Sequence, residues 1–414
     1  MKIAILGYGT VGSGVYEIIT NGNTEELKKL EVKSVFARSR DKMHLATDDI
    51  NEIINDEEIS VVVECLGGLN PAYDFIKRSL ENGKHVVTAN KAVAAKYLDE
   101  FVELAEKNNV KFIFEASVGG GIPWLVNLER TRRVDDVKRV YGIFNGTSNF
   151  ILDNMYRNDQ EFDSTLKTAQ DLGYAEADPT ADVEGLDAAR KLAILASISF
   201  NRRIFFEDVT VEGITKIDTE DISFGKEFGY NIKLIGIAKE SSKGLSLNVY
   251  PAFVPLTHPL ASVRGSYNAI YIKGNGIDDA MFYGRGAGSL PTGSSVVSDI
   301  MEVAKNVAFE STGRFKPFYF DQKNIYSPGK IQSSYYMRLA VDNKTGVLAK
   351  IATKLAEQKI SVLSIVQRNK DPETAVLAIV TSKCPHSYIL NLIDSFNSLR
   401  SVKDVCSVIR IMEA

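Results

Sequence analysis

Short apolar runs alternate with longer amphipathic stretches over the first third of the chain. The runs predicted to be β-strands lie at residues 2–6, 32–37, 60–64, 85–88 and 111–115. Amphipathic stretches at 71–82 and 96–108 have the apolar spacing of helices. The run VVVECL is apolar at nearly every position, as in strands buried on both faces. This alternation predicts an α/β fold with a Rossmann-type, doubly wound parallel sheet over residues 1–130.

The pattern changes near residue 135. Strands of a mixed or antiparallel sheet are predicted at VKRVYGIF, LSLNVYPAFV, AIYIKG and AMFYGRG. Helices are predicted at residues 148–157, 164–172, 187–200 and 224–240. These elements predict a central α+β domain with a mixed sheet over residues 131–315. A helix beginning near Pro291 has an apolar stripe, and we expect residues 288–312 to pack back on the first domain.

A compact tail follows a segment rich in turn-forming residues. We interpret this segment, with Pro317, Ser327, Pro328 and Gly329, as a linker. Residues 331–414 then have the pattern of a strand, a helix, two strands, a helix and a last strand. This βαββαβ order predicts a separate ferredoxin-like module.

Composition is that of an ordinary globular protein, with 44% hydrophobic and 25% charged residues. The net charge of −4 gives no reason to expect nucleic acid or an anionic membrane as partner. No apolar run approaches the roughly 18 residues that a membrane span needs, and no secretory leader is recognisable. Cysteines at Cys65, Cys384 and Cys406 are few and widely spaced. They favour reduced thiols and a cytoplasmic location over a disulfide framework.

A glycine motif follows the first strand directly and opens a helix. Gly7, Gly9 and Gly12 fit GxGxxG, with Thr10 and Val11 in between. The first glycine allows a tight turn, the second lets the backbone approach a pyrophosphate, and the third lets helix and strand pack closely. The helix N-terminus favours the phosphate charge. The sequence therefore predicts a dinucleotide site at residues 7–12.

The end of the second predicted strand bears on the choice of cofactor. NAD-preferring chains usually have an acidic residue there, which bonds the ribose hydroxyls. This chain instead has Arg38, Ser39 and Arg40. Two guanidinium groups and a hydroxyl suit a 2′-phosphate, so NADP(H) is favoured, with NAD(H) as the alternative.

An acid-rich stretch, GYAEADPTADVEGLDAARKLAIL, spans residues 173–195 and leads into a predicted helix. Asp187 and Lys191 are four positions apart, so they share one helix face. The helix is otherwise apolar, and we expect its charged face to line a cleft. The alternative is an exposed acid–base pair on a solvated helix. Asp178 and Glu184 in the same stretch are interpreted as solvated charges.

Five segments have distinctive sequences: GYAEADPTADVEGLDAARK, NGTSNFIL (145–152), VTANKA (87–92), EASVGGGIP (115–123) and GRGAGSLPT (284–292). Together they resemble the homoserine dehydrogenase family with a C-terminal ACT domain. The resemblance implies interconversion of L-aspartate 4-semialdehyde and L-homoserine by hydride transfer with a nicotinamide cofactor. Such a reaction serves threonine, methionine and isoleucine biosynthesis. It also implies that the central domain carries catalysis and dimerisation.

The same resemblance assigns roles to charged side chains. Lys191 resembles the family's proton donor to the aldehyde oxygen, where an ammonium group also stabilises developing alkoxide charge. Lys91 resembles the second lysine of the cleft between cofactor and substrate. Glu176 and Asp187 look like the substrate-side carboxylates, with Glu176 expected at the amino-acid part and Asp187 also counted as catalytic. Asp182 is a weaker candidate for substrate binding.

Other matching positions are expected around the cofactor. Lys91, Cys65 and Gly288 are expected to line its cleft, and Cys65 replaces a residue that is often threonine in relatives. Thr147 and Asn149 are expected at the domain junction.

The stretch EASVGGGIP resembles the family's sodium loop. Glu115, Val118, Gly120 and Ile122 stand at the matching positions. Backbone carbonyls would supply most ligands, which suits a hard cation. The alternative is a glycine turn that joins the domains.

The resemblance in the tail concerns regulation and assembly. Related modules pair with their own copies and bind a pathway end product, which makes L-threonine the candidate effector at the helix start, residues 343–347. The turn DNKTG (342–346) lacks the proline of the frequent DxPG pattern. We expect a homodimer through the central sheet, doubled to a homotetramer if the tails pair. The alternative is a tail that serves only assembly.

Two other functions compete with this interpretation. One is an amino-acid-sensing regulatory protein whose nucleotide domain does not catalyse. The other is a different small amino-acid or aldehyde dehydrogenase, such as an aspartate dehydrogenase. The joint presence of Lys91, Lys191, Glu176 and Asp187 favours the enzyme, because a sensor needs no proton donor.

Overall fold

The computed structural model describes residues 1–311 and 322–412, which form two compact units. Of the described residues, the first unit comprises 1–140, 190–209, 267–311 and 322–323, and the second comprises 141–189, 210–266 and 324–412. β7 (Val137–Ile143) and α9 (Leu186–Phe200) each run from one unit into the other. The three domains expected from the sequence stay a prediction. Pro317 of the expected linker lies outside the described residues.

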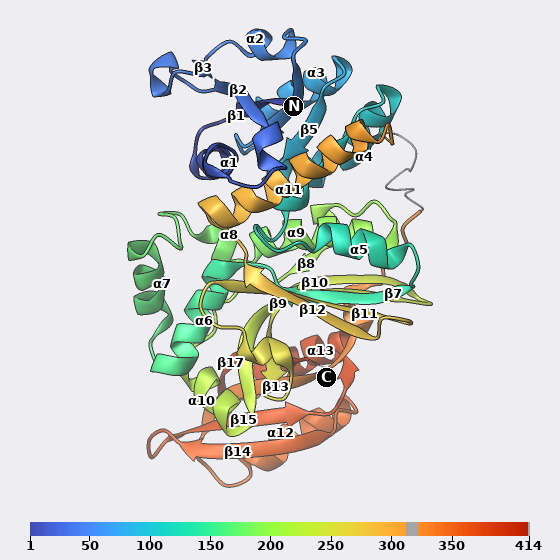
Figure 1. Cartoon of the computed structure of the whole chain (residues 1–414). Coiled ribbons are helices and arrows are strands. Elements are labelled where there is room, and N and C mark those ends of the chain that lie inside the picture. The colour runs from blue at the N-terminus through green and yellow to red at the C-terminus, as the bar shows by residue number, and fades with distance from the viewer. Residues whose placement is uncertain (312–321, 413–414) are drawn as a thin grey trace. The chain divides into compact units, whose positions relative to one another are not determined.

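A parallel sheet forms the centre of the first unit (Figure 1). Its strands are β1 (Lys2–Leu6), β2 (Glu31–Phe36), β3 (Ala46–Thr47), β4 (Ile59–Glu64), β5 (His85–Thr88) and β6 (Phe112–Ile113). All pair in parallel, in the order β3-β2-β1-β4-β5-β6. This is the doubly wound order of dinucleotide-binding sheets, and it confirms the predicted Rossmann-type fold.

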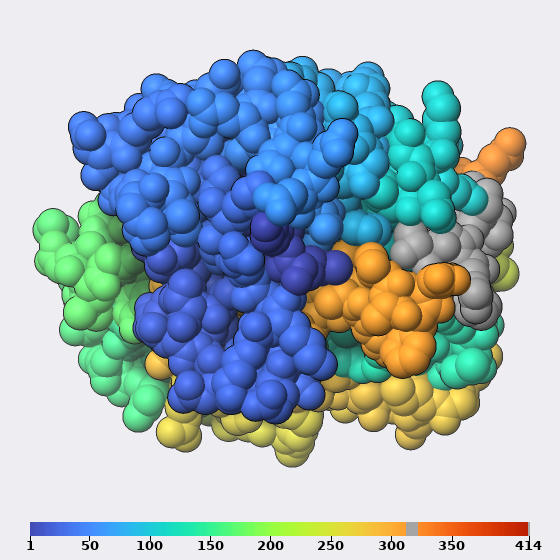
Figure 2. Space-filling model, turned by 45° about the horizontal axis from the view of Figure 1, so that its top comes forward, coloured from blue at the N-terminus to red at the C-terminus, as the bar shows by residue number. Residues whose placement is uncertain are grey.

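Helices α1 (Thr10–Asn21), α2 (Ile50–Ile54), α3 (Ala72–Glu81), α4 (Lys91–Lys107) and α11 (Ser289–Ala308) pack on this sheet or on one another. The first unit also contains α5 (Leu125–Arg132). α1 and α11 share an apolar core with β1, β2, β4 and β5. They cross closely because Gly14 has no side chain, and a Cβ there would lie 2.4 Å from the Ser289 carbonyl oxygen. Figure 2 shows the outer surface of α11, in orange, set against N-terminal residues in blue.

Two predicted elements of the first unit differ in extent. α4 begins at Lys91, earlier than expected, because the Asn90 side chain accepts hydrogen bonds from the backbone N–H groups of Ala92 and Val93. The strand expected at 111–115 is confined to β6, since Glu115 already begins a short 3₁₀ helix. A hairpin of β11 (Tyr267–Gly274) and β12 (Asp279–Arg285) completes the unit.

The second unit contains a mixed sheet with strand order β9-β10-β17-β13-β15-β14. Its strands are β8 (Thr210–Val211), β9 (Tyr230–Ser241), β10 (Gly244–Pro255), β13 (Gln332–Asp342), β14 (Val362–Asn369), β15 (Thr374–Thr381), β16 (Cys384–Pro385) and β17 (Val402–Ile411). The helices are α6 (Gly146–Asn158), α7 (Phe162–Asp171), α8 (Thr180–Val183), α10 (Thr219–Glu227), α12 (Val347–Glu357) and α13 (His386–Asn397). α6 and α10 pack against β9.

The helix predicted at 224–240 is wrong. α10 ends at Glu227, and Gly229 follows in the left-handed region with φ +80°. The rest of the stretch is β9, which pairs with β10 in antiparallel register along its whole length. Most of β9 is buried, so its apolar residues do not alternate with polar ones.

The C-terminal part of the second unit confirms the predicted ferredoxin-like order. β17-β13-β15-β14 are neighbours in antiparallel pairs, and α12 and α13 share one apolar core with β13 and β15. β17 also pairs in parallel with β10, where Arg410 lies opposite Ala252. This part is therefore continuous with the sheet of β9 and β10. Within the described ranges, no helix is both long and apolar enough to cross a membrane.

Candidate functional site

The glycine loop of the first unit has the geometry that a dinucleotide requires. Gly7 has φ +99°, and a Cβ on Gly12 would lie 1.9 Å from the Gly7 carbonyl oxygen. At Gly9 nothing lies within 4 Å of the position of a Cβ, so the backbone there is open to a ligand. No side chain caps the start of α1. The backbone N–H groups of the first turn of α1 are therefore available to bind a pyrophosphate.

Two arginines after β2 differ in what they already bind. Arg40 donates from Nε to Asp48 Oδ1 at 2.6 Å and from Nη2 to Glu52 Oε1 at 2.8 Å. Arg38 is exposed and makes no hydrogen bond or ion pair within the described part of the chain. Of the two guanidinium groups, that of Arg38 is the more available to a phosphate.

Glu64 connects the carboxyl ends of two neighbouring strands. Its side chain is fully buried at the end of β4. Its carboxylate accepts hydrogen bonds from Leu66 N at 2.7 Å, Gly67 N at 3.3 Å, Thr88 Oγ1 at 2.6 Å and Asn90 Nδ2 at 3.4 Å. Burial raises the pKa of Glu64, whereas these donors favour its ionised form. The carboxylate therefore fixes the loop after β4 and the start of α4.

That arrangement positions two residues expected at the cofactor. Lys91 is the first residue of α4, directly after Asn90. Cys65 lies beside the glycine loop, because a Cβ on Gly7 would lie 3.0 Å from the Cys65 carbonyl oxygen. Burial raises the pKa of the Cys65 thiol, which disfavours the reactive thiolate form.

Glu115 is a buried carboxylate at the start of α5. It accepts hydrogen bonds from Leu125 N at 2.8 Å and Val126 N at 2.7 Å, and its own N–H donates to Asp299 Oδ2 at 3.0 Å. Burial raises the pKa of Glu115 to about 7. Burial also raises the pKa of Asp299, and the charge of Glu115 raises it further. Neither carboxylate has a cationic side chain as partner within the described ranges.

The rest of the expected cation loop is closely packed. The Val118 carbonyl accepts from the indole N–H of Trp124, and the Ile122 carbonyl accepts from Trp124 N at 2.9 Å. Gly120 has φ +56°, and a Cβ there would lie 2.6 Å from the Gly286 carbonyl oxygen. No cluster of three or more metal-ligating side chains occurs among the residues that the structure describes. A cation here would need backbone carbonyls, which suits a monovalent ion.

In the second unit, the acidic side chains around α8 have different surroundings. Asp178 Oδ1 accepts from Thr180 N at 3.1 Å and from Thr180 Oγ1 at 2.6 Å, which starts α8. Glu184 accepts from Thr215 Oγ1 at 3.1 Å. Glu176 is exposed, and its carboxylate makes no hydrogen bond or ion pair with any described residue. Asp178 and Glu184 therefore stabilise local structure.

Asp182 and Asp187 are held together by a residue that the sequence analysis missed. Asn145 Nδ2 donates to Asp182 Oδ1 at 2.6 Å and to Asp187 Oδ2 at 2.9 Å. Asn145 begins NGTSNFIL, and its Oδ1 accepts from Ser148 N at 2.8 Å as the N-cap of α6. The signal for this capping role was an asparagine shortly before a predicted helix, a residue type that is favoured as an N-cap.

α9 carries the predicted acid–base pair. Asp187 lies in its first turn, and Lys191 follows one turn later. The two side chains are only 3% and 9% exposed. Charged groups at such low exposure are costly unless they are paired or functional, which does not fit a solvated surface pair.

Thr147 and Asn149 of α6 make structural contacts within the second unit. Thr147 Oγ1 donates to the Tyr174 carbonyl oxygen at 2.6 Å, and so holds the start of the acid-rich stretch. Asn149 Oδ1 accepts from the buried Lys233 Nζ at 3.0 Å. Burial lowers the pKa of Lys233 to about 8, and Asp153 3.9 Å away opposes that shift.

The tail contains a cavity of about 360 Å³ at the turn from β13 into α12. Residues 341–348 line it together with Gln367 and Leu377. Gly346, with φ +87°, makes the turn before α12. Asp342 and Lys344 at its rim form an ion pair at 3.5 Å.

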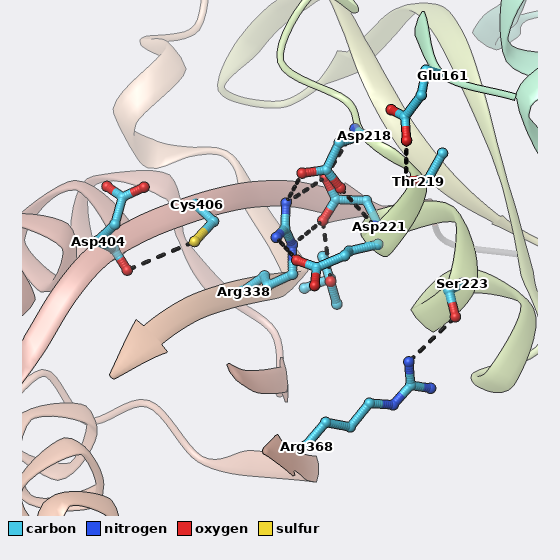
Figure 3. Close-up of polar contacts among 11 residues, drawn as sticks. Glu161, Asp218, Thr219, Asp221, Ser223, Arg338, Arg368, Asp404 and Cys406 are labelled. Atoms are coloured by element: carbon cyan, nitrogen blue, oxygen red, sulfur yellow. Dashed lines mark hydrogen bonds and ion pairs between the residues drawn. The ribbon is translucent and has the colours of Figure 1, made fainter. Parts of the chain in front are cut away.

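A cluster of ion pairs around a buried arginine joins the tail to α10 (Figure 3). Arg338 of β13 is 4% exposed and pairs with Asp218, Glu220 and Asp221, with Nε 2.8 Å from Asp221 Oδ1. Tyr336 also donates to Asp221 Oδ1, at 3.1 Å. Burial raises the pKa of Asp221, and the Arg338 guanidinium opposes that shift.

A second arginine reinforces this contact. Arg368 of β14 donates to Ser223 Oγ at 3.3 Å, pairs with Glu227, and lies 4.1 Å from the ring centre of Phe224. Figure 3 shows Arg368 reaching α10 separately from Arg338. At the start of α10, Thr219 Oγ1 donates to Glu161 Oε1 at 3.1 Å, and Glu161 is the residue directly before α7.

Comparison with known families gives two matches that together span most of the chain. The family described as "Homoserine dehydrogenase" matches residues 123–301. The family described as "Homoserine dehydrogenase, NAD binding domain" matches residues 7–115.

Curated relatives are similar over nearly the full length. A homoserine dehydrogenase from Bacillus subtilis is 39% identical over 427 residues, covering 99% of this chain and 98% of the relative. A homoserine dehydrogenase from Synechocystis is also 39% identical, and the match covers 100% of this chain and 99% of the relative.

The chain is also similar to solved structures of homoserine dehydrogenases. The structure of a homoserine dehydrogenase from Thiobacillus denitrificans has a TM-score of 0.94 at 36% identity, and the match covers 100% of this chain and 98% of that one. A hyperthermophilic archaeal homoserine dehydrogenase in complex with NADPH has a TM-score of 0.64 at 26% identity, covering 74% of this chain and 98% of that one.

Proposed function

The chain belongs to the homoserine dehydrogenase family, and we propose that Lys191, Lys91 and Asp187 carry its reaction. It is an NAD(P)-dependent oxidoreductase that interconverts L-aspartate 4-semialdehyde and L-homoserine. When bound, the reduced nicotinamide supplies a hydride to the aldehyde carbon. Lys191 stabilises the alkoxide charge that develops on the aldehyde oxygen and donates a proton to it. Glu176 and Asp182 contribute to substrate binding.

The observation that supports this assignment is the burial of Asp187 and Lys191 one turn apart on α9. A lysine shielded from water can act on a developing negative charge more strongly than a solvated lysine, because screening is weaker there. The alternative of a non-catalytic sensor gives no reason to keep this pair buried.

Replacement of Lys191 tests the proposal. We expect Lys191→Ala to bind NADPH like the unchanged protein but to lose about 100- to 10,000-fold in kcat for oxidation of NADPH with the semialdehyde. Lys167→Ala, an exposed lysine on α7, is the control and should leave kcat unchanged. A kcat for Lys191→Ala within a few-fold of the unchanged enzyme would exclude it as the donor.

NADP(H) is the proposed physiological cofactor. Arg38 is exposed at the end of β2 with no acidic neighbour bonded to it, and so suits a 2′-phosphate. Arg40 is a secondary contributor because Asp48 and Glu52 already bind it. The archaeal relative solved with NADPH supports the same choice. Gly7, Gly9, Thr10, Val11, Gly12, Cys65, Lys91 and Gly288 are the other proposed cofactor contacts.

A sodium ion is proposed at the loop of Glu115, Val118, Gly120 and Ile122. The support is electrostatic: Glu115 and Asp299 are buried together without a described cationic side chain, so a monovalent cation would relieve their repulsion. The ion would stabilise the loop, away from the reacting atoms.

Regulation by L-threonine is proposed at the tail cavity. An amino acid fits a cavity of about 360 Å³, and the start of α12 offers backbone N–H groups to its carboxylate. We further propose a homodimer through the central sheet, doubled to a tetramer through the tails. The catalytic and regulatory parts would then correspond to the expected domains 131–315 and 331–414, with 1–130 binding the nucleotide.

A further inference from the structure

Asn145 stands out because it bonds two carboxylates of the acid-rich stretch at once. Its amide nitrogen is 2.6 Å from Asp182 Oδ1 and 2.9 Å from Asp187 Oδ2. The two carboxylate oxygens therefore lie side by side, within reach of one nitrogen. Asn145 and Asp187 are both buried, so water screens their interactions poorly.

The orientation of the amide is fixed by the helix that Asn145 caps. Asn145 Oδ1 accepts from Ser148 N at 2.8 Å, at the start of α6. Turning the amide over would break this cap and would place its oxygen against two anionic oxygens. The helix therefore forces both N–H donors of Asn145 toward Asp182 and Asp187.

The Asn145 side chain is also neutral, so it can fix the positions of the two carboxylates without supplying a positive charge. A lysine or arginine at this position would bring the two carboxylates together by neutralising them. The amide bonds both carboxylates without adding a charge of its own. It holds Asp187 in one orientation in the first turn of α9, the helix that also carries Lys191.

We propose that Asn145 is a positioning residue of the reaction, which holds Asp182 and Asp187 as a fixed pair of anionic acceptors on the substrate side. The proposal rests on the assignment of Asp187 and Asp182 to the substrate site. It also places Asp182 with Asp187 as a functional pair, whereas the carboxylate of the exposed Glu176 makes no hydrogen bond or ion pair with a described residue.

Two substitutions separate positioning from helix capping. Serine and aspartate are both good N-caps, so Asn145→Ser and Asn145→Asp preserve the start of α6. Neither has two N–H donors for the carboxylates. We expect Asn145→Ser to lower kcat/KM for the semialdehyde about 100-fold, while the Kd for NADPH stays within twofold.

Asn145→Asp adds a second measurement, the pH dependence of activity, which should not change if Asn145 has only a structural role. A third carboxylate beside Asp182 and Asp187 favours protonation of one of the three, and a protonated carboxyl again donates a hydrogen bond. The activity of Asn145→Asp relative to the unchanged enzyme should therefore rise as the pH falls from 8 to 6. Asn154→Asp, the same change further along α6, is the control and should show a constant ratio near one.

The results distinguish this proposal from the assignment of the proton donor. If Lys191→Ala is inactive but Asn145→Ser retains full kcat/KM, the positioning role is overturned and the donor stands. A pH-independent loss in Asn145→Asp, equal for NADPH binding and catalysis, would also overturn it. A selective loss in Asn145→Ser with an active Lys191→Ala would keep the positioning role and reject the donor.

Discussion

At the scale of single residues, the pairing of a side chain within the chain determines whether it is available to a ligand. Arg38 and Arg40 are two positions apart, yet only Arg40 is bonded to Asp48 and Glu52. We expect Arg38→Ala to weaken NADPH binding about 10- to 100-fold and NADH binding little, since only NADPH has the 2′-phosphate. Arg40→Ala is the matched comparison and should change the preference less. Fluorescence titration with both cofactors measures these effects, and equal losses for NADPH and NADH in Arg38→Ala would contradict the assignment.

Residue-scale patterns in the sequence identified only some of the candidate site. Asp187 and Lys191 were found because their spacing is local and matches one helix turn. The role of Asn145 was missed because its bonds to Asp182 and Asp187 join positions far apart in the chain. The bonds of Arg40 were missed for the same reason. A sequence pattern reports periodicity, whereas such contacts depend on how separate segments pack.

At the scale of elements, the loop from Glu115 into α5 should make stability depend on pH. The pKa of Glu115 is about 7 in the folded chain, above its ordinary value of 4.5. A raised folded-state pKa stabilises the protein fully below about pH 4.5, and that contribution is lost as the pH rises through 7. We expect a loss on the order of 3 kcal/mol across this window, which Glu115→Gln should remove. Asp299 acts in the same direction.

Sodium should oppose this loss if it binds at the same loop. A bound cation favours the ionised carboxylate. Replacing a bulky organic cation in the buffer with sodium should therefore raise Tm at pH 8 and have little effect at pH 5. Thermal denaturation at both pH values measures this, with the exposed Glu103→Gln as control. A sodium effect of the same size in Glu115→Gln would place the ion elsewhere.

Two buried elements were predicted with nearly their observed bounds. The strand at 85–88 was predicted with the observed bounds of β5, and the helix at 187–200 differs from α9 by one residue. The stretch 224–240 failed because β9 is buried along most of its length and its apolar residues fit helical spacing as well as a strand. Pairing with β10 decided between the two, and that pairing is not a local property.

At the scale of the whole molecule, the second unit connects its tail cavity to the acid-rich stretch through α10. Arg338 lies on β13, the strand that leads into the cavity, and it binds Asp218 at the cap of α10. A few residues before Asp218, Ile214 N donates to the Val183 carbonyl oxygen at 2.8 Å, at the end of α8. α8 contains Asp182. We therefore expect a shift of β13 to reach Asp182, one of the carboxylates proposed to bind substrate.

Replacement of Arg338 tests this connection. Arg338→Met should destabilise the fold by about 3–5 kcal/mol, because it leaves the buried Asp221 without its cationic partner, and it should weaken the proposed inhibition by L-threonine. Tm and threonine inhibition curves measure the two effects, and the exposed Arg400→Met is the control. A lower Tm with an unchanged inhibition curve would show that the cluster only fastens the tail.

The pairing of β17 with β10 has a consequence for how the chain folds as the ribosome makes it. β10 leaves the ribosome long before β17, so the early part of this unit waits with aromatic side chains such as Phe224, Phe228 and Phe253 uncovered by Tyr336. Such a nascent chain is a natural client for chaperones. A protein terminated after Gly329 should remain in that state, and light scattering during expression should show it aggregating where the full chain does not. A monodisperse truncated protein would mean that the early part folds without its last strand.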